Sequence, residues 1–426
     1  MDPTLIFLSV FFVLLALGVP VAFMLIVVGI ALAVNAGMGP SIIVQRMIGG
    51  MDNFPLLAIP FFMLAGEIMN QGTIARRLVE LASALVGRFR GGLAQVNILS
   101  SMFFGGISGS SVADTAAIGS LLIPAMVEEG YDVDYAAAVT AASSTMGIII
   151  PPSIPMVLYG IISGVSIIRL FIAGIIPGIL IGLVQMLTTY VLARKRGFKR
   201  GEKVSFSKIT TRFKSASGAF LIPIIIVGGI LSGAFTPTEA AVIAAATALF
   251  LAKYVYHALR IRDLAPLFAK AAITTATVMF LVGVATGVAW LLTISRVPFE
   301  IIDIITAISE NQLIVLLMIN VFLLVIGCVM DLTPALLVLT PIFRPILPML
   351  GIDPVFFGVM MIMNLGIGLI TPPIGTILYI ACGIGNIGID RISRAIIVYV
   401  GAMLLLLLVV ILNPGIVLFL PNLILG

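Results

Sequence analysis

The chain has 426 residues, of which 61% are hydrophobic and only 10% charged, with a net charge of +5 and a mean hydropathy of +1.27. Because soluble domains carry roughly 25% charged residues, this composition excludes an ordinary water-soluble globular protein. Apolar stretches of about 20 residues, long enough to cross a bilayer, recur from Leu5 to the C-terminus. We therefore expect a single all-α, polytopic membrane unit.

The first apolar stretch, Leu5–Val34, is too long for one upright span and short for two, and we expect two helices that turn at Gly18-Val19-Pro20. It lacks a basic segment and a small-residue cleavage site, so we expect a retained span and not a signal peptide. A connection with few positive charges follows around Asn35–Asn53 and is expected outside. Four arginines then gather between residues 76 and 90 (Arg76, Arg77, Arg88 and Arg90). The positive-inside rule places this segment in the cytoplasm.

The densest basic region, Arg194–Lys214, is also expected in the cytoplasm, and its second half, Ser205–Lys214, is expected to form an amphipathic helix on the inner membrane surface. From there the chain crosses three times before it reaches the outer stretch Ser295–Gln312, which carries few positive charges. The three expected crossings are Phe220–Leu231, Ala240–Tyr256 and Ala265–Thr293.

Two stretches of the chain resemble each other. The first reads Gly-Gly-Ile-Ser-Gly-Ser-Ser-Val-Ala-Asp-Thr (105–115) and is followed by Gly-Ile-Ile-Ile-Pro-Pro (147–152). The second reads Gly-Cys-Val-Met-Asp-Leu-Thr-Pro (327–334) and is followed by Gly-Leu-Ile-Thr-Pro-Pro (368–373). Ser110 precedes Pro151 by 41 residues, and Asp331 precedes Pro372 by 41. This spacing predicts a duplicated unit, a re-entrant hairpin followed by a broken helix.

The charge pattern gives the two units opposite orientations. The first hairpin enters from the cytoplasm after Arg90 and returns there at Glu128–Asp134. The second begins outside at Ser309–Asn311 and returns outside at Gly351–Pro354. An inverted-topology repeat with discontinuous helices is typical of secondary transporters.

Each unit carries the chemistry of an ion site. Paired prolines interrupt a helix, and in hydrocarbon the freed carbonyls persist only beside a cavity or a bound ion. Facing hydroxyls from a hairpin tip, they form an all-oxygen site suited to a hard cation such as sodium. Asp331, an ionisable residue at membrane depth, is expected to be functional. Ser111 with Asp114 is expected to cap the second arm of the first hairpin, and Thr333 with Pro334 that of the second.

The alternative is a purely structural role, in which the prolines only kink their helices and the Gly/Ser clusters only allow close helix packing. For either element alone that explanation is adequate. The same pairing found twice, in opposite orientations, favours ion sites.

An intramembrane serine protease is a rival, because Gly106-Ile-Ser-Gly109 fits the Gly-x-Ser-Gly pattern of such enzymes. The serine needs a base, and the single histidine, His257, lies at an expected cytoplasmic helix end beside Arg260. No His/Cys/Asp cluster suggests metal catalysis. We therefore expect no enzyme.

A channel is the second rival. Channels use symmetric filters contributed by several subunits, whereas an internal inverted repeat favours alternating access. The chain has no Gly-x-x-x-x-Gly-Lys loop, so ATP is not expected to be its direct energy source.

The motifs Gly-Ile-Ser-Gly-Ser-Ser-Val-Ala-Asp-Thr, Ile-Ile-Pro-Pro-Ser-Ile-Pro and Ile-Thr-Pro-Pro-Ile-Gly resemble those of the large membrane subunit of tripartite ATP-independent periplasmic (TRAP) transporters. With Ala-Phe-Thr-Pro-Thr-Glu-Ala (234–240), the resemblance covers essentially the whole chain and looks closest to the sialic-acid branch, although dicarboxylate relatives share every motif. It implies sodium-coupled uptake of an organic acid across the bacterial inner membrane by an elevator-type movement. Sialic acid is favoured, and a C4-dicarboxylate or another carboxylate is the alternative.

The resemblance also implies partners: a small four-helix membrane subunit, a periplasmic binding protein that delivers the substrate, and membrane lipids, with no nucleic acid. We expect scaffold helices in residues 1–90, 166–309 and 389–426, the last as a single helix with a periplasmic C-terminus. The transport domain is expected in residues 91–165 and 310–388.

Sodium is expected at two sites or more, each where a hairpin tip meets its broken helix. The ligands expected for site 1 are Ser108, Ser110, Gly147, Ile150 and Pro152, and those for site 2 are Gly327, Asp331, Thr333, Gly368, Thr371 and Pro373. The substrate is expected between the two tips, with its carboxylate facing half-helix N-termini. Its polar groups are expected to contact Ser111, Ser153 and Thr376, unless these hydroxyls only satisfy local carbonyls. On the outer face, Glu239 and Arg296 are expected to dock the binding protein.

Overall fold

The computed structural model describes residues 2–70, 72–198, 200, 205–309 and 311–426, without the side chains of residues 72, 305 and 306. Within these residues the chain is built from helices, and its only strand-like contact is an isolated bridge between Arg90 and Arg200. Seven described helices are long and apolar enough to cross a membrane, or up to eight if one bent pair counts as a single span. The expectation of an all-α polytopic membrane protein is confirmed.

The N-terminal helices are short. Leu5–Val34 forms two helices as expected, separated by a turn in which Gly18 has a φ of +70°. Asn35–Asn53 was expected to be a connection, but most of it is helical, because Ser41–Met51 packs its apolar side against a later helix. The elements are α1 (Pro3–Ala16), α2 (Val21–Asn35), α3 (Ser41–Met51), the 3₁₀ turn η1 (Phe54–Leu57), α4 (Ala58–Met69) and α5 (Gly72–Val86).

The middle of the chain holds the longest helices. The elements are α10 (Ile167–Lys195), α11 (Phe206–Leu231), α12 (Pro237–Phe250) with the π-helical turn η3 (Leu251–Val255), α13 (Ile261–Ile294) and α14 (Val297–Ile308). Ser205–Lys214 is not a separate surface helix, because its helix continues unbroken into the apolar part of α11. Part of the expected Arg194–Lys214 loop (199 and 201–204) lies outside the described residues. The outer stretch Ser295–Gln312 contains α14, and its residue 310 also lies outside them.

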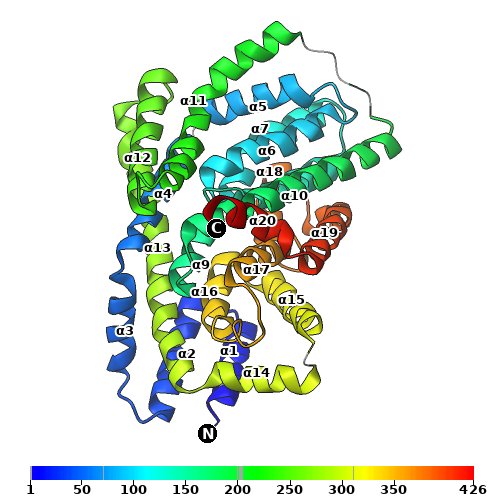
Figure 1. Ribbon diagram of the computed structural model, residues 1–426. Coiled ribbons are helices and arrows are strands. Elements are labelled where there is room, and N and C mark those ends of the chain that lie inside the picture. The colour runs from blue at the N-terminus through cyan, green and yellow to red at the C-terminus, as the bar shows by residue number, and fades with distance from the viewer. Residues whose placement is uncertain (1, 71, 199, 201–204, 310) are drawn as a thin grey trace.

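Helices α3 and α4 run antiparallel along α13 and bend by 66° at the break between them. Figure 1 shows α3 and α13 side by side. An added Cβ on Gly50 would lie 2.6 Å from the Thr286 side chain, so only glycine allows this approach. Near the other end of α13, Lys270 Nζ lies 2.8 Å from Glu67 Oε2. The bent pair is thus the eighth candidate span.

The duplicated hairpin and broken helix are both present. The first unit comprises α6 (Gly92–Ser108), α7 (Ser111–Glu128), α8 (Val133–Ser144), η2 (Thr145–Ile148) and α9 (Ile154–Ser163), and the second comprises α15 (Gln312–Val329), α16 (Leu332–Phe343), α17 (Pro354–Gly368) and α18 (Thr376–Gly385). Each unit also packs against the other: α18 of the second unit contacts α7 of the first, and α9 of the first contacts α16 of the second. The second half of each broken helix therefore covers the second arm of the other hairpin, as a pseudo-two-fold relation requires.

The duplication extends to the flanking helices. α5 precedes the first hairpin and α14 the second, while α10 follows the first broken helix and α19 (Ile389–Leu412) follows the second. Residues 389–426 are not one helix, because Pro414 cannot continue α19, and α20 (Gly415–Leu425) starts anew. The division into scaffold and transport domains remains a prediction.

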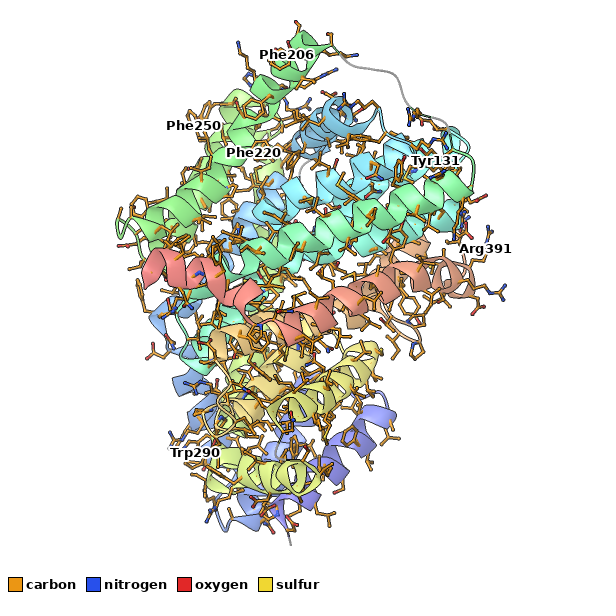
Figure 2. All side chains as sticks on the ribbon, turned by 45° about the vertical axis from the view of Figure 1, so that its right-hand side comes forward. Tyr131, Phe206, Phe220, Phe250, Trp290 and Arg391 are labelled. Carbon is orange, nitrogen blue, oxygen red and sulfur yellow. The ribbon has the colours of Figure 1, made fainter. Side chains whose placement is uncertain are left out.

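The two ends of the molecule are marked by different side chains. Figure 2 shows Phe206 and Trp290 at opposite ends, with Arg391 on a flank. The guanidinium of Arg46 lies 4.0 Å from the centre of the Trp290 ring, and Trp290 is on the part of α13 expected near the outer surface. Phe206 begins the basic end of α11, expected at the inner surface. Aromatic residues are enriched at both membrane interfaces, so these two residues fit interfacial positions, and the orientation of the chain stays a prediction.

Candidate functional site

The first hairpin tip lies directly against the first helix break. α6 ends at Ser108, and the chain reverses through Gly109, whose φ of +62° suits glycine. An added Cβ on Gly109 would lie 2.8 Å from the Pro152 carbonyl oxygen, and one on Gly147 would lie 3.3 Å from the Ser110 carbonyl oxygen. On Gly106, it would lie 3.5 Å from the Ile150 side chain. The structure therefore brings together the residues expected for site 1.

The prolines of this break leave carbonyl oxygens without their helical donors. In an α-helix each carbonyl accepts from the N–H four residues on. Pro151 and Pro152 have no N–H, so the carbonyls of Gly147 and Ile148 lose that partner. The Ile148 carbonyl accepts from the Ser153 hydroxyl at 2.5 Å instead. The Gly147 carbonyl has no such helical donor, and Gly147 itself packs against Ser110 at the tip.

Ser110, and not Ser111, is the N-cap of α7. Its hydroxyl accepts from the Ala113 N–H at 3.3 Å, and the Ser108 hydroxyl lies 3.4 Å from both the N–H and the carbonyl of Ser110. The expected cap of Ser111 with Asp114 is therefore wrong by one position, because the helix begins one residue earlier than the pattern indicated. The hydroxyls of Ser108 and Ser110 stand together at the tip.

The second tip repeats this arrangement with a carboxylate in place of a hydroxyl. Gly327 and Gly368 touch through their backbones, since an added Cβ on Gly327 would lie 3.3 Å from the Gly368 Cα. Asp331 is the N-cap of α16, so Thr333 and Pro334 sit inside the first turn and do not cap it as expected. The reason is that α16 starts at the residue after Asp331, as α7 starts at the residue after Ser110.

Asp331 accepts a hydrogen bond from Thr376, a residue that was expected to contact the substrate. Thr376, the first residue of α18, donates its hydroxyl to Asp331 Oδ1 at 3.0 Å. This contact joins the second tip to the far side of the second break. Thr371 donates its hydroxyl to the Ile367 carbonyl at 2.6 Å, Thr333 is half-buried, and Pro373 is exposed at the surface of the break. Pro373 thus lies more openly than the other residues expected for site 2.

The three residues expected to bind substrate differ in their surroundings. Ser153 is buried, and its hydroxyl both donates to Ile148 and accepts from the Met156 N–H. Ser111 is buried at the tip. Thr376 is half-buried and is engaged by Asp331. The Ser153 hydroxyl thus satisfies a local carbonyl, as the alternative weighed for it holds, whereas the Thr376 hydroxyl bonds to the carboxylate of Asp331 at the second tip.

Asp114 is a functional candidate that the sequence reasoning underrated. It was expected to be a cap, yet it is 0% exposed in α7, one turn beyond the tip. Neither of its carboxylate oxygens makes a well-directed hydrogen bond among the described residues, although the Ser101 hydroxyl lies near enough to interact with the carboxylate. A buried carboxylate with so little compensation is costly unless a cation or a proton accompanies it. No motif signals this, because the packing of the hairpin decides the burial.

Buried polar side chains also tie each hairpin to its broken helix. Asn97 on α6 donates to the Thr140 hydroxyl at 2.7 Å, and the Ser143 hydroxyl donates to Asn97 Oδ1 at 3.1 Å. In the second unit, Asn364 Nδ2 donates to the carbonyl and side-chain oxygens of Asn320 at 2.9 and 2.8 Å. Sequence reasoning missed these bonds because the residues lie outside the repeated motifs. They join each hairpin to its own broken helix by buried hydrogen bonds.

The two residues expected to dock the binding protein are both exposed. Glu239 belongs to a capping box at the start of α12, where its Oε2 accepts from the N–H and the hydroxyl of Thr236, each at 2.8 Å. Arg296 has a φ of +57°, and its guanidinium lies 5.7 Å from the Phe299 ring centre. Glu239 therefore has a structural role in capping α12, whereas the contact described for Arg296 is with an aromatic ring.

Comparison with known proteins agrees with this geometry. A family model described as "Tripartite ATP-independent periplasmic transporter, DctM component" matches residues 8–416. The 2,3-diketo-L-gulonate TRAP transporter large permease protein YiaN of Escherichia coli is 42% identical, over 97% of both chains. The sialic acid TRAP transporter large permease protein SiaM of Vibrio cholerae is 40% identical, again over 97% of both. These near-equal identities do not favour the sialic-acid branch.

The fold is shared with a more distant transporter. The Alcanivorax borkumensis YdaH transporter, whose crystal structure is described as having an unusual topology, superposes with a TM-score of 0.62 over 97% of this chain and 98% of its own. Its sequence identity is 15%, so the likeness concerns the fold alone. With the family match over nearly the full length, the chain is a multi-pass membrane protein that belongs to the DctM component, or large permease, family of TRAP transporters.

Proposed function

We propose that this permease carries an organic acid across the bacterial inner membrane, driven by sodium that binds where each hairpin tip meets its broken helix. The observation that carries the proposal is the paired contact of the tips with the breaks, Gly109 against Pro152 and Gly327 against Gly368. Each contact places a backbone carbonyl oxygen, that of Pro152 or of Gly327, against the opposing glycine, and oxygen is the ligand that a hard cation prefers.

The charge distribution supports cation binding at both tips. Site 2 contains the carboxylate of Asp331. Site 1 has neutral ligands, but Asp114 lies one helical turn away, and its oxygens make no well-directed hydrogen bond among the described residues. A sodium ion at either tip would offset the cost of these carboxylates in a low-dielectric interior.

The substrate would then bind between the tips, where the N-termini of α7 and α16 point partial positive charge at an anion. The two relatives described above are named for diketogulonate and sialic acid, which are both organic acids. We therefore propose a carboxylate substrate, with sialic acid and a C4-dicarboxylate among the candidates. Because ion and substrate have opposite charge, each would raise the affinity of the other.

TRAP large permeases work with a small membrane subunit and a periplasmic binding protein. We propose that both partners serve this chain, that Arg296 helps to dock the binding protein, that the repeats move as an elevator, and that the C-terminus is periplasmic. The exposure of Arg296 supports the docking role, and the packing of α7 with α18 and of α9 with α16 supports movement of the two repeats together.

Uptake into proteoliposomes that contain the permease, its small subunit and the binding protein tests the proposal. With an inward sodium gradient, candidate acids should accumulate, and replacing sodium by choline should abolish accumulation. Asp331→Asn should abolish it too, whereas Asp390→Asn, which removes an exposed carboxylate at the start of α19, should not. Wild-type uptake by Asp331→Asn would remove site 2 from the mechanism, and accumulation without sodium would overturn the coupling.

A further inference from the structure

A cavity of about 390 Å³ lies between the surface-facing helices α5 and α11 and the first hairpin. Its lining includes no residue of the two tips or of the expected ion sites. Its lining consists of Arg76, Val79, Glu80, Ser83, Ala84, Leu93, Val96, Leu121, Leu122, Ala125, Lys208 and Arg212.

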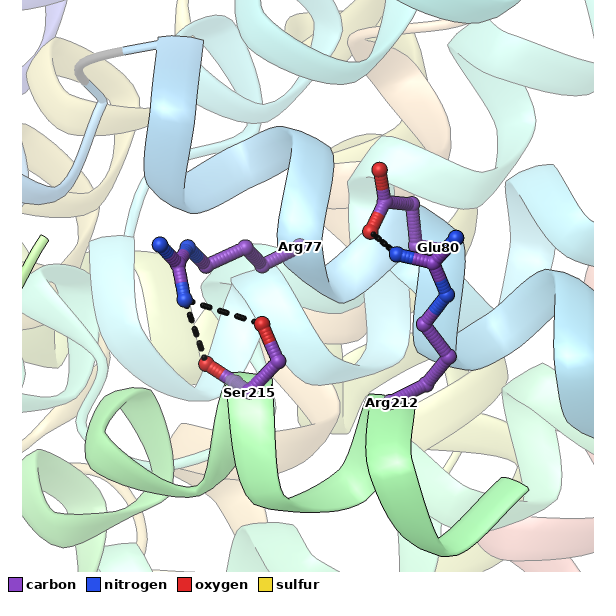
Figure 3. Close-up of polar contacts among 4 residues, drawn as sticks. All are labelled: Arg77, Glu80, Arg212 and Ser215. Carbon is purple, nitrogen blue, oxygen red and sulfur yellow. Dashed lines mark hydrogen bonds and ion pairs between the residues drawn. The ribbon is translucent and has the colours of Figure 1, made fainter. Parts of the chain in front are cut away.

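The polar part of this cavity is strongly basic. Three cationic side chains, those of Arg76, Lys208 and Arg212, face a single carboxylate, that of Glu80. Arg212 pairs with Glu80 (Figure 3). Among the described residues, Arg76 and Lys208 make no ion pair. Both side chains are exposed at the mouth of the cavity, where two cations without an ion pair offer a binding surface to an anionic group.

Neighbouring contacts fix the two helices that carry these charges. Arg77 Nη1 donates to the hydroxyl of Ser215 at 2.8 Å and to its carbonyl at 3.2 Å (Figure 3). The same guanidinium lies 4.5 Å from the centre of the Tyr256 ring. Arg77, the residue next to Arg76, thus fixes α5 against α11, so the positions of the basic residues along the cavity are set by the fold.

Apart from Ser83, the rest of the lining is apolar and comes mainly from the hairpin. Leu93 and Val96 on α6, with Leu121 and Leu122 on α7, form this wall. A soluble anion gains nothing from such a surface, whereas a lipid with a charged head and an acyl chain gains from both walls. Phe206, at the end of α11, is 78% exposed, as suits a helix end in a lipid interface.

We propose that this cavity binds an anionic phospholipid of the inner leaflet. The phosphate would contact Arg76 and Lys208, and one acyl chain would lie along Leu93 and Leu121, the two half-buried leucines of the lining. Basic pockets between transmembrane helices on the cytoplasmic side are a recognised way of holding anionic lipid headgroups. The bound lipid would join the first hairpin to α5 and α11.

Binding of tail-labelled phosphatidylglycerol to the detergent-purified full-length chain tests the proposal. Arg76→Gln combined with Lys208→Gln should weaken binding on the order of tenfold, since each cation near an anionic headgroup adds appreciable affinity. The matched control, Arg391→Gln with Arg394→Gln, removes two exposed cations from α19 and should leave binding unchanged. Neither pair includes a residue of the ion sites.

Three outcomes would overturn the proposal. Equal binding by the Arg76/Lys208 double variant would remove the cavity as the site. Displacement of the label by millimolar inorganic phosphate would identify a soluble-anion site. Loss of binding when the small membrane subunit is co-purified with the chain would make this face a subunit interface. Weaker binding of tail-labelled phosphatidylcholine than of phosphatidylglycerol, by the same factor that separates the double variant from wild type, is the supporting result.

Discussion

Replacing Gly368 with alanine probes the contact between the second hairpin and the second broken helix. An added Cβ at this position would lie 2.5 Å from the carbonyl carbon of Gly327 and 2.6 Å from its Cα, whereas ordinary contact begins at 3.4 Å. The two backbones would have to separate by roughly 1 Å, and overpacking of this kind costs about 1–3 kcal/mol. Metal sites tolerate distance changes of only about 0.2 Å, so the separation should also dismantle site 2.

Thermal unfolding of the purified protein measures both effects, in sodium chloride and in choline chloride at equal ionic strength. Sodium should raise the Tm of the wild type, because a ligand that binds only the folded state stabilises it. Gly368→Ala should have a lower Tm and a much smaller sodium-dependent rise. Gly383→Ala in α18, where an added Cβ meets nothing within 4 Å, should keep the full rise. A full sodium-dependent rise in Gly368→Ala would refute the placement of an ion at this contact.

Three further predictions concern other parts of the account. Asn364→Leu removes the amide that donates to the buried side-chain oxygen of Asn320 and should lower the free energy of unfolding by about 1–3 kcal/mol. The double variant with Asn320→Leu should recover part of that loss, and no recovery would contradict a direct interaction between the two side chains. Ser110→Ala should raise the sodium concentration for half-maximal uptake while membrane abundance stays near wild type; unchanged sodium activation would count against site 1. Arg296→Glu should slow uptake at low binding-protein concentration and be rescued at saturation, because exposed charges mainly steer encounter. Intact uptake at low concentration would place the docking surface elsewhere.

The repeat was predictable from sequence because paired prolines interrupt a helix, and glycine-rich segments allow a tight turn, whatever packs around them. The common spacing of 41 residues from Ser110 to Pro151 and from Asp331 to Pro372 correctly identified equivalent positions, and both residues are N-caps in the structure. The assignment of the caps to Ser111 and Thr333 failed. In the run Ser110-Ser111 either hydroxyl satisfies the pattern, and only the path of the chain after Gly109 decides between them.

Burial and long-range pairing could not be predicted. Asp114 occupies a first-turn position where an exposed acid would be ordinary, and it is the packing of the first hairpin that encloses it. The bond between Thr376 and Asp331 joins residues 45 apart across a helix break. The basic residues of Ser205–Lys214 fit a surface helix as well as the end of a long one, since both have the same helical period.

Direct binding of radioactive sodium to the purified protein tests the central claim most closely, because it requires neither the partners nor the identity of the substrate. The account predicts at least two sodium ions per wild-type chain, with one fewer in Asp331→Asn and no loss in the control Asp390→Asn. Wild-type sodium binding by Asp331→Asn, or no saturable sodium binding by the wild type, would contradict it.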